Sequence, residues 1–269
     1  PARRAGKRMT HARIYASDWR RYREAHAKLR GDAARKLEEY FDSLPWDTDA
    51  QRALQRLCDF ADQLLLEYGN ADATLSASLY DEMMQGSAPM AELAELPSSA
   101  TVYANMRDVV ERATSLDSAR SMASGEMQRL VKRCGVETMR QNAVAHKAMW
   151  AWVCIGDSCA FCRTLGSQGW VFASKAVRAG RHAEHIHADC DCEFVVKRPG
   201  DTLEIEGYDP DALLDEYADA PGENWKEKVN SMRRADYTQE FADQRNARRR
   251  ELYRAARDEG ASPGEAADA

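Results

Sequence analysis

Apolar residues recur every three or four positions along most of the first half of the chain, which predicts a series of amphipathic helices. The first is expected from Ser17 to about Phe41. The break at 43–49 caps a second helix, which is expected to end near Gly69. Gly135 is expected to close the helix that precedes it. Further helices are expected over 72–85, 99–115, 118–134 and 136–147.

The pattern changes at Met149–Cys154, where aromatic and β-branched residues predict a short strand. From Gly156 to Gly207 the chain carries glycines, histidines and most of its cysteines, which indicates a compact α+β module. The predicted fold class is therefore mainly α, with a small α+β zinc-binding module near residues 150–200. Four parts are predicted: a helical N-terminal region (1–135), the module (136–207), a charged helical segment (208–258) and a disordered tail (259–269).

Helix-forming residues outnumber Val and Ile, which supports this fold class. No window is apolar enough to span a membrane, and the start Pro1-Ala-Arg-Arg lacks the apolar region of a signal peptide, so we expect a soluble protein made in the cytoplasm. The net charge of −6 is unevenly spread, because residues 1–36 hold twelve Lys or Arg and three acids. The segment 245–250 is basic again. Both ends could contact polyanions, or they could be ordinary solvated helix faces.

The cysteines suggest metal binding rather than disulfides, because their number, seven, is odd and four lie between Cys159 and Cys192. Cys159 and Cys162 form a C-x-x-C pair, and His187, Cys190 and Cys192 follow 25 to 30 residues later. Thiolate and imidazole ligands at this spacing suit tetrahedral Zn²⁺. Five candidates compete for four positions, so either Cys190 or Cys192 could be a bystander. The alternative is a set of ordinary buried thiols.

Other histidines and cysteines in the chain are weaker candidates. His185 lies near the proposed ligands, but His187 has the better H-x-x-C-x-C spacing, and His182 is expected in solvent. Cys58, Cys134 and Cys154 are expected in the core. His11, His26 and His146 have no partner that the sequence identifies.

Zinc enzymes with similar ligands need further residues that this pattern does not supply. A deaminase requires H-x-E followed by P-C-x-x-C, whereas here the C-x-x-C pair comes first and no proline precedes it. A metalloprotease requires H-E-x-x-H, which Glu184-His185 matches only in part. The thiolate-rich set indicates a closed, structural zinc site, and we expect no catalytic activity.

The run from Arg140 to Cys192 resembles the phage Mu F-like head morphogenesis family, the minor capsid proteins of tailed phages and prophages. The matching pieces occur in the family's order: Arg140-Gln-Asn142, Trp150-Ala-Trp152, Asp157-Ser-Cys159-Ala-Phe-Cys162, Leu165-Gly166, Gly169-Trp-Val-Phe172 and His187-Ala-Asp-Cys190-Asp-Cys192. Ala188-Asp189 replaces the family's usual Pro-Asn, and Asp191 replaces its arginine. These departures leave the ligand spacing intact but put in doubt any partner contact that the arginine makes.

The resemblance implies a structural virion protein at the portal or the inner capsid wall, acting in head morphogenesis. Its expected partners are the portal protein and the inner capsid surface, with non-specific contact to packaged DNA and none with a membrane. The alternatives are a nucleic-acid-binding protein with a zinc module, or a toxin enzyme fused behind the module. For the enzyme, residues 201–269 offer neither a histidine nor a glycine-rich phosphate loop.

Overall fold

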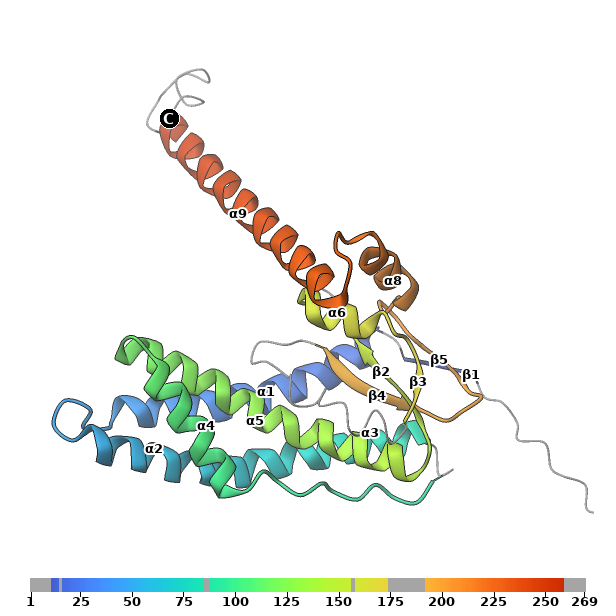
Figure 1. Cartoon of the computed structure of the whole chain (residues 1–269), viewed down its shortest axis with the longest axis horizontal. Helices are drawn as coiled ribbons and strands as arrows, with labels where there is room; N and C mark the ends of the chain where they lie inside the picture. Colours follow the sequence, from blue (N-terminus) through green and yellow to red (C-terminus); the bar gives the residue numbers. More distant parts are fainter. Residues whose placement is uncertain (1–10, 15, 85–87, 156–157, 174–191, 259–269) are drawn as a thin grey trace, which may run out of the picture. The chain divides into compact units, whose positions relative to one another are not determined.

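The computed structural model describes residues 11–14, 16–84, 88–155, 158–173 and 192–258 (Figure 1). The chain divides into two units by its internal contacts. The first comprises residues 1–158 and 168–210, and the second comprises residues 159–167 and 211–269. The mainly helical fold class is confirmed. The predicted boundaries at 135 and 207 remain predictions.

The helices of the first unit pack around one apolar core. They are α1 (Ala16–Asp42), α2 (Ala50–Leu64), η1 (Leu65–Gly69), α3 (Asn70–Met84), α4 (Ser99–Arg112) and α5 (Leu116–Ala145). Helix α5 packs against α1, α3 and α4. The core draws on the predicted apolar stripes, with Leu37, Leu57, Leu64 and Leu130 all buried. A stripe that recurs with the helical period places its side chains on one face, which is why these helices could be predicted locally.

The helix that begins after Asp49 does not end at Gly69, contrary to the prediction. Asp49 caps it, since its Oδ1 accepts a hydrogen bond from the backbone nitrogen of Arg52 at 3.0 Å. The chain then passes through the π-helical turn η1 and continues into α3. A Cβ at Gly69 would lie 2.9 Å from Cys134 Sγ. Glycine therefore allows α5 to approach at this position and does not stop the helix.

Gly135 likewise lies inside α5, so the predicted break between two helices there is wrong. A Cβ at this position would lie 2.3 Å from Asp72 Oδ2 and 2.4 Å from Ser76 Oγ, both on α3. The glycine is required because α3 packs directly onto the backbone of α5.

A small antiparallel sheet follows α5, and its central strand is the predicted one. Its order is β3 (Val171–Phe172), β2 (Met149–Val153) and β4 (Glu193–Lys197). A separate parallel pair joins β1 (His11–Ile14) to β5 (Thr202–Ile205). Residues Ala151, Val153 and Val195 of the antiparallel sheet form a second apolar cluster with Leu203 and Ile205 of β5. The sheet thus supplies the strand part of the predicted α+β region.

The second unit contains α6 (Ala160–Gly166), most of α8 (Pro210–Asp219) and α9 (Trp225–Asp258). Arg163 of α6 ties them together, with Nε 2.9 Å from Glu216 Oε1 and Nη2 2.8 Å from Asp236 Oδ1. Helix α9 makes up most of the predicted charged helical segment, 208–258. The predicted disordered tail, 259–269, lies outside the described residues. Within the described part, no helix is both long and apolar enough to cross a membrane.

Candidate functional site

The C-x-x-C pair lies at the start of α6. Cys159 is the N-cap residue, and its Sγ accepts a hydrogen bond from the backbone nitrogen of Cys162 at 3.5 Å. Cys162 is buried, and Cys159 is partly exposed. One turn therefore holds both sulfurs, which is the arrangement that a C-x-x-C metal pair requires.

Cys192 immediately precedes β4 and is also buried. The strand register ends with Val153 paired to Glu193, the residues next to Cys154 and Cys192. Cys154 is buried as predicted, and so are Cys58 and Cys134. The sequence did not indicate that β2 would pair with the strand that follows Cys192, since the two segments are far apart in the chain.

The other candidates, His187 and Cys190, lie outside the described residues, as do His182 and His185. Among the residues that the structure does describe, no three His, Cys, Asp or Glu side chains are grouped so that they could hold a metal ion. The full ligand set therefore remains a prediction.

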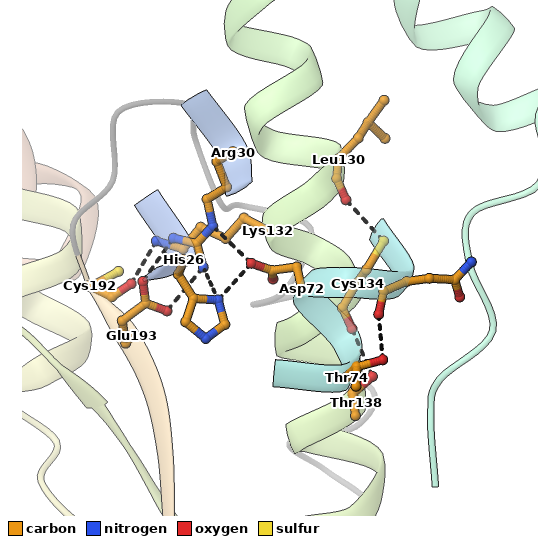
Figure 2. Close-up of polar contacts among 11 residues, drawn as sticks. His26, Arg30, Asp72, Thr74, Leu130, Lys132, Cys134, Thr138, Cys192 and Glu193 are labelled. Carbon is orange, nitrogen blue, oxygen red and sulfur yellow. Dashed lines mark hydrogen bonds and ion pairs between the residues drawn. The ribbon is translucent and has the colours of Figure 1, made fainter. Parts of the chain in front are cut away.

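A buried cluster of charged residues lies beside Cys192, and the sequence did not predict it (Figure 2). It draws His26 and Arg30 from α1, Asp72 from α3, Lys132 from α5 and Glu193 from β4. All five side chains are buried. Two cations, Arg30 and Lys132, thus face two carboxylates inside the first unit.

Short polar contacts join the members of this cluster. Arg30 Nη1 donates to Glu193 Oε1 at 2.8 Å, and Lys132 Nζ donates to the carbonyl oxygen of Cys192 at 2.6 Å. His26 Nδ1 lies 2.6 Å from Asp72 Oδ1. Because a carboxylate only accepts hydrogen bonds, Nδ1 carries the proton, and Arg30 Nη2 at 3.3 Å from the same nitrogen is a close contact and not a second bond.

Comparison with known proteins gives one match that covers most of the chain. The family model described as VG15 protein matches residues 13–220. The chain belongs to the VG15 family. It is therefore a phage-related protein, which confirms the coarser part of the resemblance but does not distinguish a Mu F-like minor capsid protein. No curated protein matches the chain, and no solved structure does.

The VG15 match includes every candidate ligand and the whole buried cluster, but it ends before α9 begins at Trp225. The candidate ligands and the buried cluster therefore lie in the part of the chain that matches the VG15 family.

The charges in the buried cluster favour the ionised form of Glu193. Burial alone would raise the pKa of its carboxyl, but the charges of Arg30, Lys132 and His26 outweigh burial and lower that pKa to about 2. Burial lowers the pKa of the Arg30 guanidinium, and Glu193 and Asp72 reverse this and raise it. Tyr22 lies nearby, and burial, followed by these two carboxylates, raises the pKa of its hydroxyl well above the usual value. Arg30 and Glu193 thus form an ion pair next to a neutral phenol.

The free energy of unfolding should fall as the pH drops from about 4.5, the ordinary pKa of a glutamate, towards about 2, the pKa of Glu193 in the folded chain. The folded pKa is the lower one, so ionised Glu193 stabilises the fold fully above the ordinary value, and its contribution is lost as the pH falls through the folded value. Urea unfolding of wild type and Glu193→Gln, with chelator present, measures this. The difference in unfolding free energy should be constant at neutral pH and shrink below about pH 4.5. A difference that persists undiminished at pH 2 would contradict the assignment.

The buried cluster suits a structural role better than a chemical one. Its ionised groups are paired, and their side chains are enclosed, so no substrate could reach them without local opening. One sequence signal did exist: Tyr22, His26 and Arg30 recur every four residues on the apolar face of α1. The partner of Arg30 lies 163 residues away, and no local pattern reveals it.

Asn142, part of the motif that suggested the phage resemblance, also has a structural task. Its Nδ2 donates to the carbonyl of Glu92 at 2.7 Å, and its Oδ1 accepts from the backbone nitrogen of Glu92 at 3.0 Å. Thr138 Oγ1, one turn earlier, accepts from the backbone nitrogen of Ala94. These bonds hold the segment between α3 and α4 along α5. Asn142 pairs with both the N–H and the C=O of Glu92, as a residue of a neighbouring strand would.

Proposed function

We propose that this chain is a structural minor head protein of a tailed phage or prophage, which acts in head morphogenesis at the portal or the inner capsid wall of the virion. The observation that carries the proposal is the VG15 match over residues 13–220, because it encloses the whole motif run from Arg140 to Cys192. Those motifs occur in the order found in phage head morphogenesis proteins. The proposal assigns no catalytic step to the chain.

The proposal includes a structural zinc ion held by Cys159, Cys162 and His187, with Cys190 or Cys192 as the fourth ligand. Cysteine thiolates are donors that this metal prefers. Cys159 and Cys162 share one turn of α6, and Cys162 and Cys192 are buried. When bound, zinc supplies folding free energy, since such ligands are seldom arranged without it.

Metal content measured by mass spectrometry of the purified protein tests the zinc site. Wild type should carry about one zinc per chain, as expected for one tetrahedral site, and the Cys159→Ala, Cys162→Ala double variant should lose it together with thermal stability. Cys58→Ala is the matched control, because this buried core thiol lies outside the proposed ligand set and its loss should leave the zinc in place. A folded wild type without metal would refute the site.

Association with the portal protein of the same phage tests the capsid role. The purified chain should co-elute with assembled portal, and its absence from that complex at low and moderate salt would contradict the proposal. The basic residues at both ends also suggest non-specific contact with packaged DNA. Binding to duplex DNA should then be independent of sequence and weaken steeply as salt is added. Tight, sequence-selective binding would instead favour a nucleic-acid-binding regulator.

A further inference from the structure

Residues 88–98, which we call the strap, join α3 to α4 and belong to no helix or strand. Figure 1 shows the strap as an extended trace that leads into α4. It lies in the first unit, and one of its edges is held by α5. Asn142 binds the backbone N–H and C=O of Glu92, and Thr138 binds the backbone N–H of Ala94. Along this edge, side chains of α5 take the place of a neighbouring strand.

The opposite edge of the strap is open. Among the residues that the structure describes, none bonds to the backbone N–H or C=O of Leu93 or of Glu95. In an extended chain successive residues direct these groups to opposite sides, so the two residues that flank Ala94 present theirs away from α5. Such a row of backbone groups is a template for pairing with another extended chain. Pro89 and Pro97 lack the N–H donor, which limits that pairing to the residues between them.

The side chains beside the open edge are apolar and acidic. Met90 is 81% exposed and Leu93 is 48% exposed, although both are large apolar residues. Glu92 and Glu95 are exposed as well, and neither carboxylate forms an ion pair within the described part of the chain. Exposed apolar side chains next to unpaired carboxylates suit a partner that supplies both apolar contacts and positive charge.

A second copy of this chain is a poor fit for the open edge. Two copies that paired edge to edge about a two-fold axis would bring Glu92 and Glu95 of one strap close to the same carboxylates of the other. Like charges that face each other across paired strands are destabilising. The partner that fits is instead an extended segment that carries Lys or Arg.

We propose that the open edge of the strap is an interaction surface that binds an extended, basic segment of the portal protein. The backbone groups of Leu93 and Glu95 pair with that segment, as in other cases where a peptide adds to an exposed edge. Its basic side chains face Glu92 and Glu95, and Met90 and Leu93 supply apolar contacts. The inference rests on the proposed function and gives it a defined surface on the first unit.

The chain offers a matched control for each kind of side chain. Leu116, at the start of α5, is 48% exposed, the same fraction as Leu93. Glu111 of α4 is exposed and, like Glu95, forms no ion pair with any residue that the structure describes. Leu116→Ser and Glu111→Lys therefore make the same changes as Leu93→Ser and Glu95→Lys, but outside the strap.

Affinity of the full-length chain for assembled portal, measured by biolayer interferometry, tests the inference. Leu93→Ser and Glu95→Lys should each weaken binding about tenfold or more, because the first removes an apolar contact and the second places a cation against a basic partner. Leu116→Ser and Glu111→Lys should retain wild-type affinity. Hydrogen exchange reports the backbone pairing, because the amides of Leu93 and Glu95 should exchange more slowly once portal is bound.

The outcomes separate this inference from the proposed function. If wild type binds portal but the strap variants bind equally well, or if exchange within the strap is unchanged, the surface is wrong and the capsid role stands. If wild type does not bind portal, both fail. Equal weakening by a strap variant and its matched control would show a general response to the substitution and also overturn the surface. Should Leu93→Ser fail to fold, Glu95→Lys carries the test, because it changes only an exposed carboxylate.

Discussion

Arg30→Met should lower the free energy of unfolding by about 3–5 kcal/mol at neutral pH, the usual cost of removing one member of a buried ion pair. The substitution keeps the volume of the side chain but leaves Glu193 without its hydrogen-bonded partner. Asp72 Oδ1, 3.5 Å from Arg30 Nε, loses its cation as well. Urea unfolding followed by circular dichroism measures the effect.

Two further variants make this prediction specific. Arg35→Met removes an exposed pair with Glu39 from the same helix and should leave the unfolding free energy nearly unchanged. The double variant Arg30→Met, Glu193→Met removes both charges of the pair, so it should recover part of the lost stability. If Arg30→Met is as mild as Arg35→Met, the buried pair does not stabilise the fold.

The helices could be predicted where the signal is local. Leu57 and Leu64 of α2 are separated by two helical turns, so their common face is visible in the sequence. The predicted helix ends at Gly69 and Gly135 were wrong because each glycine is needed for a contact with a residue distant in the sequence. Each glycine accommodates a neighbour from another helix, Cys134 for Gly69 and Asp72 for Gly135. A glycine that stops a helix and a glycine that admits another helix have the same appearance in a single sequence.

The candidate site divides in the same way. The spacing of Cys159 and Cys162 is local, and the structure places both in one turn as that spacing predicts. The sequence predicts only that Lys132 lies in a helix, because its partner is the backbone carbonyl of a residue 60 positions away. Every residue has a backbone carbonyl, so no pattern of residue types could have revealed this contact.

The aromatic residues of β2 and β4 carry the second large effect. Trp150 and Trp152 lie on the same face of β2, and the register sets Phe194 opposite Trp152. The Phe194 ring stacks on Trp150 with centroids 4.8 Å apart and meets the edge of Trp152 at 5.6 Å. All three side chains are buried. Phe194 therefore links both tryptophans across the strand pair.

Phe194→Ala should accordingly lower the unfolding free energy by about 3–5 kcal/mol, since it leaves a cavity beside two indole rings. Phe172→Ala is the matched control on the other side of β2, because Phe172 is 62% exposed and its truncation should change stability by no more than about 0.5 kcal/mol. Near-ultraviolet circular dichroism adds a local readout, because only Phe194→Ala should alter the tryptophan signal. Equal effects of the two variants would mean that the aromatic contacts do not hold β4 to β2. The backbone pairing of β2 with β4 and the bond from Lys132 to Cys192 would then hold the strand in place.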